Sequence, residues 1–410
     1  MVWKTEGRKM PHKIPEFSAK LEENGWRISH SGLSEGDGIL YYARGFDTAA
    51  IDEGREPRGP YLIFDGNRLL TDLYGQIPLF RGKSSVSTEI STETLQHNPL
   101  ISIEFGDGMN LLRRDADHLD ALKISPKKVS PDEIADRFRE AVLLRAEDSD
   151  RIGLLLSGGV DSSAIAAVLT ASGYDFTAFC VSTDDIAYGK EERKDITAAR
   201  ALSKKLGFDL VEVVLDIDRT EEAIPEIYRI TGMKEYMNST PVYLPVITAL
   251  SITYYFALES ARRCGCTDVF SGIGSEEIFG GFVDRTGEDL NAQVMKRTAT
   301  IYHRDLWRDY SLASHSSILL SYPFLDNELV KMALSVDAKQ KVRNGEKKYI
   351  WRKAAERLGV PEENAWRKNK ATQYGSGADR VLEHIVRRSG KRYRIAYLEG
   401  VLNSMPQEKI

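Results

Sequence analysis

The stretch "LLLSGGVDSSAIAAVL", residues 154–169, sets the expected fold and chemistry of this chain. Its apolar run is broken by Ser-Gly-Gly at residues 157–159 and resumes after an acid and two serines. A buried strand, a glycine-rich turn and a helix N-terminus point several backbone N–H groups into one concavity, which favours an anion such as phosphate. Asp161 would repel that anion unless a divalent cation lies between them, so the loop also predicts Mg²⁺.

The segments around this loop predict an α/β fold. Ser130 is a good N-cap, and Pro131 with the acids that follow it is typical of a first helical turn. Further on, apolar strand-like runs alternate with helical ones, which predicts a parallel sheet covered by helices on both faces. Ligands of such sheets bind at the carboxyl ends of the strands. We expect strands over 152–156, 176–181 and 209–215, and helices from about residue 162 and over 193–206.

The N-terminal part has a different pattern. Residues 61–74, "YLIFDGNRLLTDLY", predict a hairpin that turns at 65–68. A chain of 410 residues exceeds the size at which single cores usually stop growing. We therefore expect a smaller, mostly β domain over 1–128 and an α/β domain over 129–410 that is mostly helical beyond residue 285.

Composition narrows the class of protein. The net charge is −5 with no long block of one sign, which argues against a dedicated nucleic-acid or anionic-membrane surface. Three cysteines make no disulfide framework, and the first residues lack the apolar core of a signal peptide, which favours a cytoplasmic location. The uncharged stretch 236–258 contains two prolines, so we expect a buried helix beginning near Pro245 rather than a membrane span.

Several motifs together resemble one family. "SGGVDSS" (157–163) lacks the lysine of the G-x-x-x-x-G-K-[ST] loop and resembles the pyrophosphate-binding loop (PP-loop) of ATP pyrophosphatases. "VFSGIGSEEIFGGF" (269–282), the segment ending in P-F-L-D at 323–326 and the lysine-rich segment 345–377 resemble the synthetase domain of asparagine synthetases and their amide- and lactam-forming relatives. These matches keep the family's order over roughly residues 130–380. Residues 59–80 are more faintly similar to the family's glutaminase domain.

The resemblance implies ATP and Mg²⁺ as cofactors and a small-molecule carboxylate with ammonia or an amine as substrates. The carboxylate would attack the α-phosphorus to give an acyl adenylate and pyrophosphate, and the amine would then displace AMP to form an amide. Asp161 and Glu276 would be the metal ligands. Lys348 and Lys370 would be the catalytic lysines, with Lys368 as the alternative to Lys370. The residues implied to bind ATP are Leu156, Val181, Ser271 and Gly272 for the adenosine, and Ser157, Gly158, Gly159, Asp161, Ser162 and Ser163 for the pyrophosphate.

Three departures from the family pattern concern the substrates. Val2 stands where glutamine-hydrolysing members have a nucleophilic cysteine, so we expect a degenerate first domain that does not release ammonia from glutamine. Ile273 stands where asparagine synthetases have a glutamate and lactam-forming relatives a tyrosine. Ser321 and Tyr322 stand where an arginine usually precedes P-F-L-D.

Two alternatives to the amide-forming ligase stay open. The first is an ATP pyrophosphatase that acts on a nucleic-acid base, as in tRNA modification, which only the basic stretch 387–394 favours. The second is a non-catalytic nucleotide-binding homologue, which Ile273 and Val2 favour. The resemblance also implies that two copies of the chain could form a homodimer through the first domain.

Overall fold

The computed structural model describes residues 16–405 apart from short segments. The residues left out are 1–15, 23–24, 32, 37–38, 44–57, 82–84, 89–95, 98–99, 106–108, 114–118, 120–123, 148, 184–193, 240–242, 283–289, 369–371 and 406–410. Val2 and Lys370 therefore lie outside the described residues, and the expectations that rest on them stay predictions.

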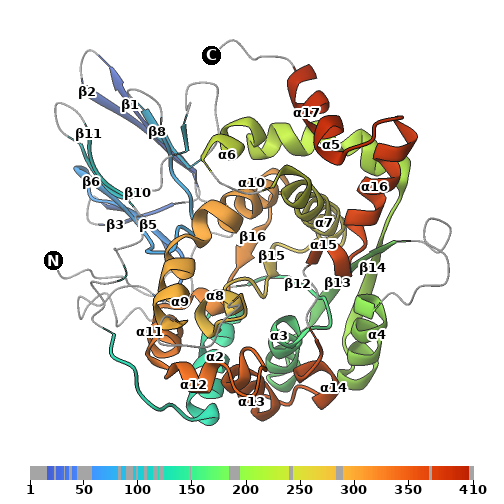
Figure 1. The fold of residues 1–410 in the computed structure, drawn as a ribbon. Coiled ribbons are helices and arrows are strands. Elements are labelled where there is room, and N and C mark those ends of the chain that lie inside the picture. The colour runs from blue at the N-terminus through green and yellow to red at the C-terminus, as the bar shows by residue number, and fades with distance from the viewer. Residues whose placement is uncertain are drawn as a thin grey trace.

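The larger part of the molecule is built on a five-stranded parallel sheet (Figure 1), as the α/β pattern predicts. The strand order is β14-β13-β12-β15-β16, and all neighbouring pairs are parallel. Strands β13 and β14 follow β12 on one side of the sheet, and β15 and β16 lie on its other side. The order thus reverses between β12 and β15, and ligands of open sheets bind at such a switch point. The strands are β12 (Ile152–Leu155), β13 (Phe176–Thr183), β14 (Asp209–Leu215), β15 (Asp268–Phe270) and β16 (Leu319–Ser321).

Side chains of β13 show why helices cover both faces of this sheet. Phe176, Ala178 and Cys180 pack into one core, whereas Phe179 and Val181 pack into another, because successive side chains of a strand point to opposite faces. The first core is shared with α2 (Pro131–Glu147), α3 (Val160–Ala171), α4 (Lys194–Leu206), α8 (Ser275–Phe279), α9 (Leu290–Ala299), α11 (Asn327–Ser335), α12 (Ala338–Lys341), α13 (Tyr349–Arg357) and α14 (Glu362–Ala365). The second is shared with α5 (Ile217–Thr231), α6 (Met233–Ser239), α7 (Leu244–Arg263), α10 (Trp307–His315), α16 (Ala378–Arg388) and α17 (Arg394–Ser404).

Local sequence patterns predicted the start of several helices to within two residues. Ser130 accepts from the Glu133 N–H at 3.2 Å and donates its own N–H to Glu133 at 2.7 Å, which is a capping box at the start of α2. The helix expected from about residue 162 begins two residues earlier, at Val160. β15 and β16 were not expected, because three residues are too few to show a period.

The uncharged stretch 236–258 belongs mostly to α7, which begins at Leu244. Among the described helices, α7 alone is long and apolar enough by length and composition to cross a membrane, and 72% of the relevant window is buried inside the fold. The prediction of a buried core helix near Pro245 is confirmed.

The N-terminal part holds two antiparallel sheets, the blue and teal strands of Figure 1. The expected hairpin forms: β5 and β6 pair antiparallel, and Gly66 in their turn has φ +88°. The sheets pack face to face through apolar side chains such as Phe17 and Phe64, whose ring centroids lie 5.3 Å apart. One sheet contains β1 (Glu16–Glu22), β2 (Gly25–Ser31), β7 (Phe80–Arg81), β8 (Ser85–Ser87) and β9 (Gln96–His97). The other contains β3 (Ser34–Gly36), β4 (Ile39–Ala43), β5 (Tyr61–Phe64), β6 (Arg68–Thr71), β10 (Leu100–Phe105) and β11 (Met109–Arg113).

Asp326 of the P-F-L-D segment ties this part to the larger one. Its buried carboxylate accepts from Arg58 Nε at 3.0 Å and from Arg145 Nη1 at 3.4 Å, and it caps α11 through the N–H groups of Glu328 and Leu329. The role of this motif aspartate is therefore structural. The division of the chain at residues 128 and 129 stays a prediction.

Candidate active site

The turn after β12 has the shape that the glycines predict. Gly158 has φ +69°, and a Cβ there would lie 2.7 Å from the Cβ of Ala198, so only glycine fits. Gly159 is the N-cap of α3 and supplies no side-chain cap, which leaves the first N–H groups of the helix for an anion. Ser157 and Ser162 support the turn, since the Ser162 hydroxyl accepts from the Ser157 N–H at 3.2 Å. Ser163 is fully buried, and its Oγ has no hydrogen-bond partner in the described residues.

The second motif meets this turn at the switch point. Gly272 follows β15, and a Cβ there would lie 3.1 Å from the Cβ of Asp161 and 3.3 Å from the Ser162 nitrogen. Leu156 and Val181 stand at the carboxyl ends of β12 and β13, and Ser271 directly follows β15. The fold thus brings the predicted adenosine and pyrophosphate residues to one edge of the sheet.

The glycines of the second motif make room for Glu276. A Cβ on Gly281 would lie 1.6 Å from Glu276 Oε2, and the Gly281 N–H donates to the Glu276 carbonyl at 2.8 Å. Gly274, with φ +102°, packs against Leu325 at a distance that leaves no space for a side chain. Gly281 is therefore required by the carboxylate of Glu276, and Gly274 by the P-F-L-D segment.

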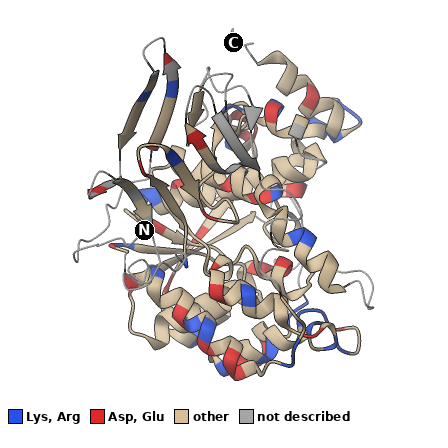
Figure 2. Ribbon diagram, turned by 90° about the vertical axis from the view of Figure 1, so that its left-hand side faces the viewer, with Lys and Arg blue, Asp and Glu red and all other residues tan. Residues whose placement is uncertain are grey.

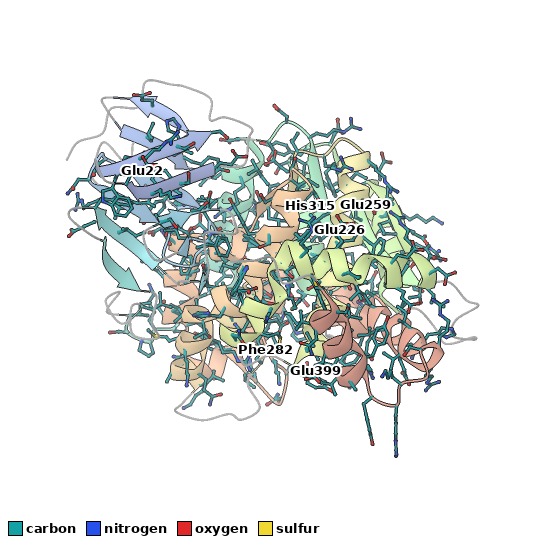
Figure 3. The ribbon with its side chains drawn as sticks, turned by 90° about the horizontal axis from the view of Figure 1, so that it is seen from above. Glu22, Glu226, Glu259, Phe282, His315 and Glu399 are labelled. Atoms are coloured by element: carbon teal, nitrogen blue, oxygen red, sulfur yellow. The ribbon has the colours of Figure 1, made fainter. Side chains whose placement is uncertain are left out.

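Glu277, the next acid of the motif, has a different environment. It is buried and pairs with Arg304 at 3.1 Å, and desolvation raises its pKa to about 7 although Arg304 opposes the shift. Arg304 and Arg297 also lie over the ring of Phe282, which is labelled in Figure 3. Glu277 is thus engaged with the fold, whereas Glu276 faces the loop.

Lys348 lies between the two predicted metal ligands. Its buried Nζ donates to Asp161 Oδ2 at 2.7 Å, forms an ion pair with Glu276 and contacts Ser275 Oγ at 3.3 Å. Burial acts to lower the pKa of Lys348, but Asp161 and Glu276 outweigh it and raise that pKa above its usual value. Lys348 also has φ +55°, a left-handed backbone that costs a non-glycine residue about 1 kcal/mol or more and is typical of functional sites.

Trp351 orients the same aspartate. Its Nε1 donates to Asp161 Oδ1 at 2.8 Å, and its buried ring stacks on Phe279 at 5.4 Å and contacts Phe138 and Phe324. Sequence reasoning missed this residue. The available signal was its place one helical turn after Lys348.

Asp161 and Glu276 are of the ligand type that a Mg²⁺ ion prefers. Both carboxylates contact the same Lys348 ammonium, so they lie next to each other beside the loop. Mg²⁺ is typically bound by one or two carboxylates together with substrate phosphates.

Comparisons with known proteins identify the family of the chain. The asparagine synthase family model matches residues 133–298 and 284–395, which is more than half of the chain. The chain belongs to the asparagine synthase family.

Relatives with this family name are only moderately similar. A Methanocaldococcus jannaschii protein provisionally named glutamine-hydrolyzing asparagine synthetase 1 is 27% identical over 299 residues, which cover 63% of this chain and 52% of the relative. The glutamine-hydrolyzing asparagine synthetase of Gallus gallus is 29% identical over 58% of this chain and 42% of the relative, and that of Homo sapiens is 27% identical over the same shares. The chain spans about half the length of these relatives. The solved structure of NMN synthetase from Francisella tularensis covers 67% of this chain and 94% of its own at 13% identity, but its TM-score of 0.32 is too low to carry an argument.

Ile273 differs from the family pattern for a packing reason. It lies between the two cores that flank the sheet and contacts apolar side chains of both. Its N–H donates to Ser271 Oγ at 3.4 Å. The position is therefore filled by an apolar side chain that can neither accept nor donate a proton.

Arg308 lies close in space to Tyr322, which stands near where the family's arginine usually precedes P-F-L-D. Tyr322 is fully buried beside Tyr254, Arg308 and Asp309, and its hydroxyl has no hydrogen-bond partner in the described residues. Arg308 Nε donates to Asp309 Oδ1 at 2.6 Å. Desolvation raises the pKa of Asp309 to about 7, and Arg308 offsets only part of it. Tyr254 connects this group to the site, because its hydroxyl lies 3.2 Å from Ser271 Oγ.

The structure describes the lysine-rich segment 345–377 except for residues 369–371. Lys368 is exposed, and Lys370 lies outside the described residues. Two neighbours contact the PP-loop turn: Asn364 Nδ2 donates to the Gly158 carbonyl and Arg367 Nη1 to the Ser157 carbonyl, both at 2.9 Å. Sequence reasoning missed both, because each contact spans more than 200 positions of the chain.

Other charged groups lie outside this site. His315, Glu226 and Glu259, labelled in Figure 3, are held in partly exposed ion pairs on α10, α5 and α7. Basic and acidic residues are interspersed along the helices in Figure 2. Three of the four arginines of the basic stretch are also paired: Arg387 with Glu383, Arg388 with Asp218 and Glu221, and Arg394 with Asp379.

Proposed function

We propose that this chain is an AMP-forming, ATP-dependent ligase that activates a small-molecule carboxylate and joins it to ammonia or an amine. The observation that carries the proposal is the placement of Lys348 between Asp161 and Glu276, beside a turn built to hold phosphate. The nucleic-acid alternative is weakened because three arginines of its one support, the basic stretch, are engaged in ion pairs.

The proposed roles follow from position. N–H groups of the turn at 157–159, with the hydroxyls of Ser157, Ser162 and Ser163, would hold the pyrophosphate portion of ATP. Leu156, Val181, Ser271 and Gly272 would hold the adenosine. The Lys348 ammonium supplies a fixed positive charge beside the turn, and a preorganised charge of this kind stabilises the negative charge that grows at the α-phosphate. Lys370 would add a second positive charge.

Asp161 and Glu276 would hold the Mg²⁺. When bound, this ion would neutralise phosphate charge and so allow an acid inside an anion site. Trp351 keeps the Asp161 carboxylate in one orientation through its Nε1 hydrogen bond.

Ammonium or a free amine, rather than glutamine, is the proposed nitrogen source. The three cysteines of the chain are Cys180, Cys264 and Cys266, all in the part of the sequence that follows the N-terminal β part. Cys180 and Cys266 are buried, and desolvation raises both thiol pKa values, that of Cys266 to about 11. A raised pKa removes the thiolate that glutamine hydrolysis needs.

The test is ATP–pyrophosphate exchange with Mg²⁺ over a panel of carboxylates. We expect exchange with at least one carboxylate, and AMP plus an amide once ammonium or an amine is added. Glutamine alone should give no amide, and glutamate released from glutamine by the pure chain would contradict the assignment of the nitrogen source.

Other outcomes decide between the alternatives. Tight ATP binding without exchange on any carboxylate would support the non-catalytic homologue. AMP formed only in the presence of RNA would support the base-modifying enzyme. The domain division at 128/129, a degenerate glutaminase-like first domain, a homodimer and a cytoplasmic location remain part of the proposal.

A further inference from the structure

Helix α14 and the segment that follows it return to the PP-loop turn and supply donors to its carbonyl groups. Asn364 is buried and donates to the Gly158 carbonyl, and Arg367 donates to the Ser157 carbonyl. A turn that points its N–H groups at an anion directs its carbonyls away from the anion and into the protein. Carbonyls in such a place need hydrogen-bond donors. The shape of the turn thus depends on residues about 200 positions later in the chain.

Arg367 is itself held in place. Its Nη2 forms an ion pair with Asp195, a buried acid in the first turn of α4. One guanidinium therefore bridges a carboxylate on α4 and a carbonyl of the turn, which the planar fork of arginine allows and a lysine ammonium does less well. Asp195 is also tightly covered, since a Cβ on Gly375 would lie 1.7 Å from its Oδ2.

The chain beyond Gly375 is fixed as well. Gly377 has φ +79°, and a Cβ there would lie 2.7 Å from Cγ2 of Thr183 at the end of β13. Ser376 Oγ lies 3.0 Å from Thr253 Oγ1 on α7. Arg367 and Ser376, both in the lysine-rich segment, are therefore each held by the fold, the first of them directly at the phosphate-binding turn.

We propose that Arg367, held by Asp195, is a positioning residue that sets the shape of the phosphate-binding turn and couples the turn to the lysine-rich segment. The ligand concerned is the pyrophosphate portion of a nucleoside triphosphate, so the inference rests on the proposed function. Arg367 acts through the Ser157 carbonyl. Its loss alters how the N–H groups of the turn are presented without removing any group assigned to the ligand.

The experiment compares Arg367→Gln and Arg367→Lys with Arg357→Gln. Arg357 is a matched control, because it forms an exposed ion pair with Asp132 on a neighbouring helix. We expect kcat/KM for ATP in pyrophosphate exchange to fall about tenfold or more in Arg367→Gln, less in Arg367→Lys, and not in the control. Thermal unfolding is measured for all three. Asp195→Asn should give an intermediate loss, since it keeps an acceptor but loses the charge.

Chemical rescue separates positioning from stability. Ethylguanidinium added to Arg367→Ala should restore part of the exchange rate, because it can replace the missing group between Asp195 and the turn. Wild-type kinetics in Arg367→Gln would overturn the proposal. The proposal would also be overturned if the loss of exchange activity matched a lowered melting temperature and neither ethylguanidinium nor the Arg367→Lys substitution restored activity.

A binding measurement keeps this test independent of the ligase assignment. Calorimetry with inorganic pyrophosphate should show weaker binding to Arg367→Gln than to Arg357→Gln. If no carboxylate supports exchange in the wild type but this difference is found, the ligase assignment fails and the positioning role stands. Equal binding by the two variants would overturn the positioning role.

Discussion

Lys348 and Lys341 lie seven positions apart, and both are buried, with exposed fractions of 1% and 0%. Lys348 at the candidate site faces Asp161 and Glu276, and its pKa is raised. Lys341 at the C-terminal end of α12 donates to Asn291 Oδ1 at 2.9 Å and to the Leu334 carbonyl, and burial lowers its pKa to about 7 even though Asp337 opposes the shift. The partners of a buried ammonium, and not burial alone, decide whether it stays charged.

The comparison has a functional meaning. Neutral partners satisfy the hydrogen bonds of Lys341, so that region is structural. The two carboxylates around Lys348 carry more negative charge than one ammonium can neutralise. Such a site is suited to binding a further cation. The comparison can be tested by substituting Lys348, Lys341 and the side chains around Lys348.

The largest effect is expected for Asp161→Asn. The change removes a carboxylate that accepts from both Lys348 and Trp351 and that is a proposed metal ligand. Pyrophosphate exchange should fall below detection, because a neutral amide neither pairs with Lys348 nor holds Mg²⁺ well. The control is Asp175→Asn, an exposed acid just before β13 at the opposite edge of the sheet. Equal exchange rates in the two variants would remove Asp161 from the mechanism.

Lys348→Met should lower turnover by about a hundredfold or more, the scale for losing one preorganised charged group. It should also destabilise the fold at pH 7, since Asp161 and Glu276 would face each other without a cation. Turnover is measured by exchange and stability by chemical denaturation, with Lys347→Met as control. Near-normal turnover in Lys348→Met would contradict the assigned role, and Lys370→Met would then be the next variant to examine.

These residues differ in how well the sequence predicts them. Asp161, Glu276 and the glycines around them lie in short motifs whose local geometry requires their residue types, so the turn, its acids and the α/β fold could be predicted. Trp351, Asn364 and Arg367 could not, because their partners in the loop at 157–161 are nearly 200 or more positions away and no local pattern marks such contacts. β16 has three residues and no period, and its place beside β15 follows only from packing.

Trp351→Phe should have a smaller effect than either charge change. Phenylalanine keeps most of the ring packing against Phe279 but loses the hydrogen bond to Asp161. A hydrogen bond to a charged group contributes about 1.5–3 kcal/mol, so turnover should fall roughly tenfold or somewhat more. Trp366→Phe is the matched control, because the Nε1 of Trp366 donates to Glu356 and not to the loop. Equal turnover in the two variants would show that Asp161 needs no orientation by Trp351.

Lys341→Met should change activity least and stability in the opposite direction to Lys348→Met. The unfolded lysine has a pKa near 10.5 and the folded one a pKa of about 7, so the unfolded chain binds the extra proton between these values. Wild-type stability therefore rises as the pH goes from about 7 to 10.5, and the full cost of the buried charge is present below about 7.

Methionine at position 341 removes that cost but leaves Asn291 without its donor. We expect Lys341→Met to be more stable than wild type by a few kcal/mol at pH 7, and less stable by about 1 kcal/mol near pH 10. Denaturation at both pH values, with the exposed Lys339→Met on the same helix as control, measures the change of sign. A difference that does not depend on pH would mean that Lys341 keeps an ordinary pKa in the folded protein, and the contrast with Lys348 would then be lost.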